Sequence, residues 1–158
     1  MPTSSTTGYS GKPVAVKLGI VAGKSVATRA APASFLGLLA PLPAGMSVAD
    51  AAKARGPFDV IVFFVRELAE LRKHIATCER RLDPDGALWV AWPKRASGVT
   101  TDVSEDRVRE VALPRGLVDN KVCAIDETWS GLRLVVRKEN RARGSSAVAK
   151  KVKRSRNT

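Results

Sequence analysis

The sequence predicts a three-layer α/β domain, with a mostly parallel sheet of about five strands that ends in an antiparallel hairpin. Three observations predict it. Residues 60–65 (VIVFFV) form an apolar run rich in β-branched and aromatic side chains, which is typical of a strand covered on both faces. Residues 67–82 carry apolar side chains every three or four positions, as an amphipathic helix does. Residues 87–92 (ALWVAW) form a second apolar run, so the three segments make a strand–helix–strand unit with parallel strands.

The segments before this unit are shorter and more weakly patterned. Ser10 is predicted to cap a short helix that has Pro13 in its first turn and that Gly19 closes. Residues 24–30 (KSVATRA) predict a strand, and their charged side chains place it near an edge of the sheet. Residues 33–40 predict a second short helix, which the following prolines stop. Residues 47–55 (SVADAAKAR) predict a helix capped by its first serine, with Asp50 at the third helical position.

The segments after the unit predict a turn, a helix and a hairpin. Residues 83–86 (DPDG) form a turn sequence, because proline fixes one φ angle and glycine supplies a positive one. The next helix begins at Asp102 or Ser104 and ends at the following Pro-Arg-Gly. Residues 118–126 and 132–137 are strand candidates separated by a short turn, which predicts an antiparallel pair.

The charge is unevenly distributed along the 158 residues, of which 44% are hydrophobic and 27% charged. Residues 137–158 hold nine basic residues and one acid, so they carry +8 of the net charge of +12. We therefore expect a disordered leader at 1–7, a folded domain at 8–137 and a disordered basic tail at 138–158. Such a tail attracts nucleic-acid phosphates without sequence preference, and a purely solubilising role is the alternative. The tail cations are Lys150, Lys151, Lys153, Arg154 and Arg156.

The cysteine count and the absence of targeting signals point to the cytoplasm. Cys78 and Cys123 are too few for a disulfide scaffold and are expected to be buried free thiols. One histidine and no CxxC pair leave almost no ligands for a structural zinc site, so we expect none. The N-terminus lacks the pattern of a signal peptide. Residues 30–49 are uncharged, but three prolines interrupt them, so we expect no membrane span.

Three motifs resemble those of an uncharacterised bacterial family, a domain of unknown function. They are GYSG at 8–11, DGALWVAWPK with the following KRASGV at 85–99, and DETWSGL at 126–132. The resemblance covers roughly residues 8–137. The order of elements is also similar to the second half of the S-adenosylmethionine-dependent methyltransferase fold. The resemblance therefore implies a Rossmann-like domain but no established activity.

The cofactor site of that fold is not recognisable in the residues. It requires a glycine-rich loop after the first strand and an acid at the end of the second strand. Here the first strand is followed by AAPAS, and no strand ending in an acid is apparent between Leu42 and Pro57. We therefore expect no cofactor and favour a non-catalytic protein. A divergent methyltransferase is the alternative.

The candidate site is the edge of the sheet where the parallel strands end, because ligands of open α/β sheets bind there. Two cations beside a Ser-Gly loop suit an anionic group such as phosphate. We therefore predict that this edge binds a small anionic ligand or a protein partner. The alternative is that the cations are solvated or pair with the nearby acids to hold the loops together. The candidate ligand-binding residues are Arg66, Lys94, Ser97, Gly98, Asp126, Glu127 and Trp129.

Overall fold

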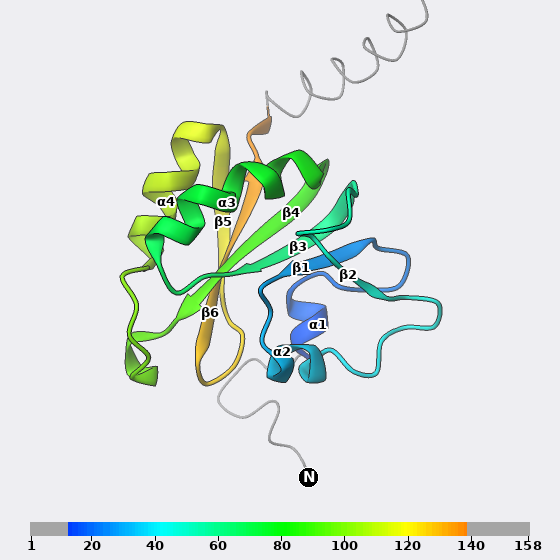
Figure 1. Ribbon diagram of the computed structural model, residues 1–158. Coiled ribbons are helices and arrows are strands. Elements are labelled where there is room, and N and C mark those ends of the chain that lie inside the picture. Colours follow the sequence, from blue (N-terminus) through cyan, green and yellow to red (C-terminus); the bar gives the residue numbers. More distant parts are fainter. Residues whose placement is uncertain (1–12, 139–158) are drawn as a thin grey trace, which may run out of the picture.

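A computed structural model of the chain describes residues 13–138 (Figure 1). The helices are α1 (Val14–Lys17), α2 (Ala33–Leu38), α3 (Leu68–Arg81) and α4 (Glu105–Ala112), with 3₁₀ turns η2 (Arg95–Ser97) and η3 (Leu113–Arg115). The strands are β1 (Val26–Arg29), β2 (Val48–Asp50), β3 (Phe58–Phe64), β4 (Leu82–Pro93), β5 (Leu117–Ala124) and β6 (Trp129–Val136). The leader, the GYSG motif and all of the predicted tail except Lys138 lie outside the described residues.

The strands form a six-stranded sheet in the order β2-β1-β3-β4-β6-β5. The first four are parallel to one another, whereas β6 runs antiparallel between β4 and β5. The predicted fold class, a mostly parallel sheet that ends in an antiparallel hairpin, is confirmed. As expected, β1 lies near an edge, because only β2 separates it from that edge.

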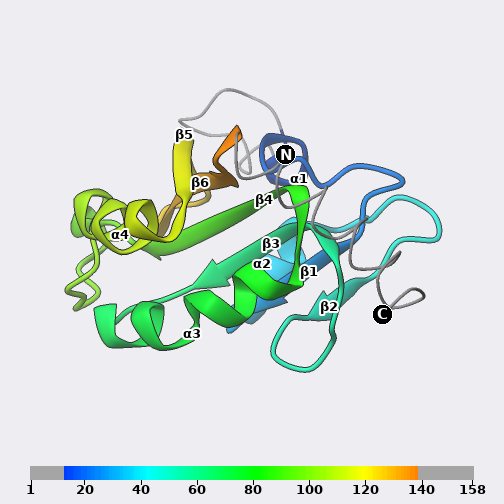
Figure 2. The ribbon, with the colours of Figure 1, turned by 90° about the horizontal axis from the view of Figure 1, so that it is seen from above.

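Helices cover both faces of the sheet, which gives three layers. Helices α3 and α4 pack on one face and the short α1 and α2 on the other, as Figures 1 and 2 show. Buried side chains accordingly form two clusters. Leu71, Ile75 and Val108 belong to the cluster under α3 and α4, and Val14 and Phe35 belong to the cluster under α1 and α2. None of the helices in residues 13–138 has the length and apolar character needed to cross a membrane.

Strand β2 replaces part of the helix predicted at 47–55, and that prediction is wrong. Val48 pairs with Val26 of β1, and Asp50 pairs with Thr28. The Asp50 carboxylate then accepts a hydrogen bond from the Ala52 N–H at 2.9 Å, so it stabilises a turn and does not cap a helix. A nine-residue segment gains little from forming an isolated helix, whereas pairing with β1 satisfies its backbone directly. This pairing supplies a strand that the sequence did not reveal.

The predicted turn at 83–86 lies within the irregular start of β4. Leu82 already pairs with Phe58, and the register shifts between Phe58 and Val60. The Asp83 carboxylate accepts a hydrogen bond from the Asp85 N–H at 2.9 Å, as such turns do. The predicted turn hydrogen bond therefore forms, but the turn is an irregularity inside β4. It does not lie before the strand.

Candidate functional site

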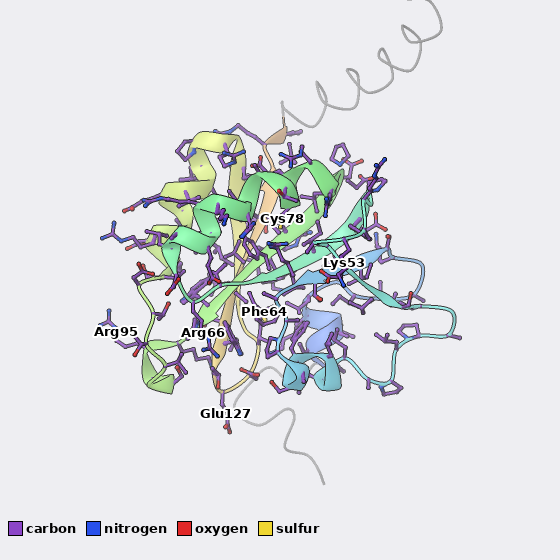
Figure 3. The ribbon with its side chains drawn as sticks, viewed as in Figure 1. Lys53, Phe64, Arg66, Cys78, Arg95 and Glu127 are labelled. Carbon is purple, nitrogen blue, oxygen red and sulfur yellow. The ribbon has the colours of Figure 1, made fainter. Side chains whose placement is uncertain are left out.

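The carboxyl ends of β1, β3 and β4 lie at one edge of the sheet because these strands are parallel. The β5–β6 hairpin brings its tip to the same edge, since Pro93 at the end of β4 pairs with Trp129 at the start of β6. The Lys94 N–H donates to the Thr128 carbonyl at 2.7 Å and joins the two segments. Figure 3 shows Arg66, Arg95 and Glu127 at this end of the molecule. The edge therefore collects the segments that carry the candidate residues.

At the hairpin tip, two of the candidate residues have structural partners. The Asp126 carboxylate accepts hydrogen bonds from the backbone N–H groups of Thr128 and Trp129, at 2.8 and 2.7 Å. The Trp129 ring is only 6% exposed and packs edge-on against Phe64, with ring centroids 4.9 Å apart. Glu127 is exposed and points away from the body of the domain (Figure 3).

Ser97 and Gly98 shape the loop that follows β4. The Ser97 hydroxyl donates to the Lys94 carbonyl at 2.7 Å and accepts from the Val99 N–H at 3.1 Å. Gly98 follows η2 with a φ of 78°, a left-handed conformation that favours glycine. Lys94 itself is half-buried. These residues therefore fix the course of the chain around the edge of the sheet.

The loop after β4 is fastened to the connection between β3 and α3. The Thr101 hydroxyl donates to the Arg66 carbonyl at 2.5 Å. The Asp102 carboxylate accepts from the Leu68 N–H at 2.7 Å. The Arg66 side chain is exposed beside this junction.

A pocket of about 520 Å³ opens between this loop and the start of α4. Its apolar wall includes Trp92, Pro93 and Val103, all of which are buried. Two arginines, Arg95 and Arg107, belong to its lining. The complete lining is Trp92, Pro93, Arg95, Gly98, Val99, Thr100, Thr101, Asp102, Val103, Ser104 and Arg107.

The two arginines of the pocket differ in their partners. Arg107 pairs with Glu110 at 3.0 Å, and both side chains are 55% exposed, so water screens the pair strongly. Arg95 is exposed and forms no ion pair with any residue of the described chain. Asp102, the carboxylate of the lining, is held by the Leu68 N–H, and the Ser104 hydroxyl accepts from the Arg107 N–H at 3.3 Å. The pocket thus offers positive charge beside an apolar wall.

Of the seven candidate residues named from the sequence, Gly98 lines this pocket. Lys94, Ser97 and Gly98 were predicted from this loop, whereas Arg95 and Arg107 were missed. A signal for Arg95 was present, because it lies between Lys94 and the Ser-Gly pair of the same loop. The position of Arg107 depends on how α4 packs, which no local pattern specifies.

One feature of a cofactor site is present after all, at the same carboxyl edge but on the outermost parallel strand. Strand β2 ends in Asp50, so the inference that no strand in this region ends in an acid is wrong. The loop after β1 begins at Ala30, whose φ of 58° is a left-handed conformation that non-glycine residues rarely adopt. The chain therefore takes a glycine-like turn at this point while carrying a methyl group.

Neither thiol lies in the site, and both cysteines are free and buried, as predicted. Burial raises the pKa of Cys78 to about 11, which keeps this thiol protonated and unreactive. His74 is half-buried on α3, edge-on to the Phe63 ring, and burial lowers its pKa, with Arg29 and Lys73 acting in the same direction. No group of three metal-ligating side chains occurs between residues 13 and 138.

Comparisons with known proteins agree with this architecture. A family model described as "Protein of unknown function (DUF3052)" matches residues 44–138. The ribosomal protein L11 methylase from Lactobacillus delbrueckii subsp. bulgaricus has a TM-score of 0.55 at 15% identity, over 78% of this chain and 75% of that chain. The magnesium protoporphyrin IX methyltransferase from Synechocystis PCC 6803 has a TM-score of 0.53 at 14% identity, over 78% and 79%. No curated protein matches the sequence. These similarities establish a methyltransferase-like Rossmann fold, as the sequence predicted.

Proposed function

Because the chain belongs to the family described as "Protein of unknown function (DUF3052)", and its fold leaves the activity open, we propose a function from the geometry of the site. We propose that the domain binds a small anionic ligand in the pocket at the carboxyl end of β4, without catalysing a reaction on it. We also propose that the protein acts in the cytoplasm.

The observation that carries the proposal is Arg95, which forms no ion pair within residues 13–138 and lines a pocket of about 520 Å³. Small-molecule sites commonly have such volumes, a mainly apolar lining and a few polar groups that fix orientation. Guanidinium groups donate two parallel hydrogen bonds to a carboxylate or phosphate. The apolar wall of Trp92, Pro93 and Val103 suits a ligand that has an apolar part as well as its charge. A nucleoside monophosphate has both features and is a suitable first probe.

The chemistry of the lining favours binding over catalysis. It contains no histidine or cysteine, and its carboxylate, Asp102, is committed to the start of α3. General acid–base catalysis needs such a group within reach of the substrate, and the lining hydroxyls of Thr100, Thr101 and Ser104 would need one as a base to act as nucleophiles. The lining side chains are therefore suited to holding an anion and not to transforming it.

Calorimetric titration of the full chain with adenosine monophosphate tests the proposal. Arg95→Ala removes the unpaired charge and is expected to weaken binding about tenfold or more, since hydrogen bonds to charged groups contribute about 1.5–3 kcal/mol. Arg55→Ala is the matched control, because Arg55 is equally exposed but precedes β3, at the opposite edge of the sheet. The control should bind like the wild type. Equal affinities of the two variants, or no binding by the wild type of any phosphate or carboxylate compound tried at millimolar concentration, would refute the proposal.

A second candidate is binding of S-adenosylmethionine by a divergent methyltransferase, and Asp50 is the observation that favours it. In dinucleotide-binding folds, an acid at the end of the second strand bonds ribose hydroxyls. The loop after β1 argues against it, because residues 30–36 contain no glycine through which the backbone could approach a cofactor closely. Asp50→Asn preserves the hydrogen bond to the Ala52 N–H but removes the charge. If this candidate is right, calorimetric titration of the wild type with S-adenosylmethionine should give a heat of binding, and Asp50→Asn should bind more weakly. No heat from the wild type at millimolar cofactor would refute this candidate.

A further inference from the structure

A second cationic hollow lies on the opposite face of the sheet, between α1 and the β5–β6 hairpin. Its volume is about 330 Å³, and it shares no residue with the pocket at the end of β4. Three of its lining side chains are basic and none is acidic. The lining is Val16, Lys17, Leu18, Gly19, Asn120, Lys121 and Arg133.

The register of the hairpin brings two of these cations together. Lys121 of β5 lies directly opposite Arg133 of β6, so both side chains emerge on the same face. The register shifts between Asp119 and Lys121, and the intervening Asn120 accepts a hydrogen bond on its Oδ1 from Arg133 Nη1 at 3.1 Å. Two cations facing each other across a strand pair repel one another, so an anion between them lowers the energy of the pair.

Helix α1 adds the third cation and forms the other wall. Lys17 Nζ donates to the Ala124 carbonyl at 3.2 Å, which holds the helix against the end of β5. The buried Trp89 Nε1 donates to the Leu18 carbonyl at 3.1 Å and fixes the end of the helix from below. The position of Lys17 is therefore set by contacts to two strands, although α1 has only four residues.

Arg133 carries a charge that the described protein does not neutralise. It is half-buried, its hydrogen bond goes to a neutral amide, and no carboxylate of residues 13–138 forms an ion pair with it. Burial also lowers the pKa of Arg133, because losing water disfavours the charged form.

The positive region extends along the hairpin beneath this hollow. Burial raises the pKa of the Cys123 thiol, and the charges of Lys17, Lys121 and Lys94 act against that rise. The charges of these three lysines therefore all act on the end of β5, and Lys121 is paired with Arg133 across the hairpin. Positive potential of this kind attracts anions and strengthens as charges accumulate.

We propose that the hollow between α1 and the β5–β6 hairpin is a phosphate-binding site, separate from the pocket at the end of β4. A phosphate oxygen pair matches the fork of the Arg133 guanidinium, and the ammonium groups of Lys17 and Lys121 supply further donors. The phosphate belongs either to a free phosphate compound or to a nucleic-acid backbone, because both present the same oxygens. The open shape of the hollow admits either source.

The test compares two double variants of the full chain. Lys121→Gln with Arg133→Gln removes two charges from the hollow while keeping most of each side chain. Arg72→Gln with Lys73→Gln removes two charges from exposed positions of α3, on the other face of the sheet. Residues 139–158 are the same in both, so any binding by the basic tail cancels in the comparison. Lys121→Gln alone is measured as well, because Lys121 is exposed and its loss does not threaten folding.

The two sources of phosphate are tested in separate arms. Inorganic phosphate is compared with chloride at equal ionic strength by thermal unfolding. A labelled DNA duplex is titrated by fluorescence anisotropy at a low and a high salt concentration. For the duplex, removing two phosphate contacts should lower the slope of log affinity against log salt by about two.

Each outcome bears on the proposal. A stabilisation by phosphate that the hollow variants lose, with duplex binding unchanged, identifies a free phosphate compound as the ligand. Loss of duplex affinity and salt slope in the hollow variants, but not in the α3 variant, identifies a nucleic-acid backbone. Equal behaviour of the hollow and α3 variants in both arms would overturn the proposal. Arg95→Ala should leave both arms unchanged, which separates this site from the pocket at the end of β4.

Discussion

The Asp102 carboxylate accepts a hydrogen bond from the backbone N–H of Leu68 at 2.7 Å, although the two residues are 34 positions apart in the chain. Leu68 is the first residue of α3, whose early N–H groups have no partner within the helix. The bond therefore completes the start of α3 and also fixes one wall of the pocket at the carboxyl end of β4. Because the neighbouring Thr101 bonds to the Arg66 carbonyl, the pocket is held by rigid elements before any ligand arrives.

Asp102→Ala is expected to lower the free energy of unfolding by about 1 kcal/mol, as removal of a helix-capping carboxylate usually does. Asp102→Asn, which keeps an acceptor oxygen, should lose less. Asp106→Ala is the control, since its side chain is 88% exposed and its ion pair with Arg109 is screened by water. Urea denaturation followed by circular dichroism measures all three. Equal losses for Asp102→Ala and Asp106→Ala would contradict a capping role for Asp102.

The Arg109–Asp119 pair joins α4 to β5 and should make stability depend on pH. Arg109 Nε donates to Asp119 Oδ2 at 2.9 Å, and this bond lowers the pKa of the Asp119 carboxyl in the folded protein. A carboxyl with a lowered folded pKa stabilises the protein above its unfolded pKa of about 3.9, and the contribution is lost as the pH falls through the folded value. Asp119→Asn should therefore cost about 0.5–1 kcal/mol at neutral pH and progressively less in acid.

Thermal unfolding of the wild type and Asp119→Asn across the acid range checks this sign. Glu110→Gln serves as the control, because its partner Arg107 and Glu110 itself are both 55% exposed. That substitution should change stability little at any pH. A difference between wild type and Asp119→Asn that grows on acidification would rule out the assigned role.

The elements that were predicted correctly are those with strong local patterns. The apolar stripe of α3 and the continuous apolar run of β3 indicate their structures without reference to the rest of the chain. The short polar turn between two strand-like segments likewise indicates the hairpin. Strand β2 was missed because its three residues form a strand only through pairing with β1, a contact that no local pattern contains.

The candidate site was predicted at the level of segments but not of side chains. Parallel strands deliver their following loops to one edge, so the edge itself follows from the topology. A polar side chain is available to a ligand only if it is not already hydrogen-bonded to the backbone of its own loop. Asp126 and Ser97 are used by their own turns. The Arg95 side chain is not used in this way, so its charge remains available.

Gly86 and Gly37 should respond oppositely to replacement by alanine. A Cβ at Gly86 would lie 2.7 Å from the Asp59 carbonyl oxygen and 3.0 Å from that of Phe58, and these backbone atoms cannot move aside cheaply. Gly86→Ala should therefore cost about 1–3 kcal/mol. A Cβ at Gly37 in α2 meets nothing within 4 Å, so Gly37→Ala should stabilise by about 0.5–1 kcal/mol through helix propensity. Urea denaturation of both variants decides, and a neutral Gly86→Ala would show that β3 and β4 separate easily there.

The two cysteines should be unreactive in the folded protein even at mildly alkaline pH. Cys78 is fully buried with a pKa of about 11, and burial also raises the pKa of Cys123. Only the thiolate reacts with a disulfide reagent, so both thiols should react slowly in the folded protein and rapidly once the chain unfolds. Ellman's reagent should label both in urea and, in the native protein, Cys123 before Cys78. Rapid native labelling of Cys78 would mean that α3 opens readily from the sheet.

Trp129 is expected to contribute to stability and not to ligand binding. Its ring packs edge-on against Phe64. Phe64 in turn contacts Phe35 of α2, with ring centroids 4.8 Å apart, so three aromatic rings pack together between α2 and the sheet. Trp129→Ala should therefore cost about 3–5 kcal/mol, as large buried truncations do. Trp129→Phe keeps an aromatic ring in the cluster and should cost clearly less. Because Trp129 does not line the pocket at the end of β4, the phenylalanine variant should also bind adenosine monophosphate with wild-type affinity. A folded Trp129→Phe protein that fails to bind the nucleotide would instead place the ligand at the hairpin tip, where the sequence first suggested it.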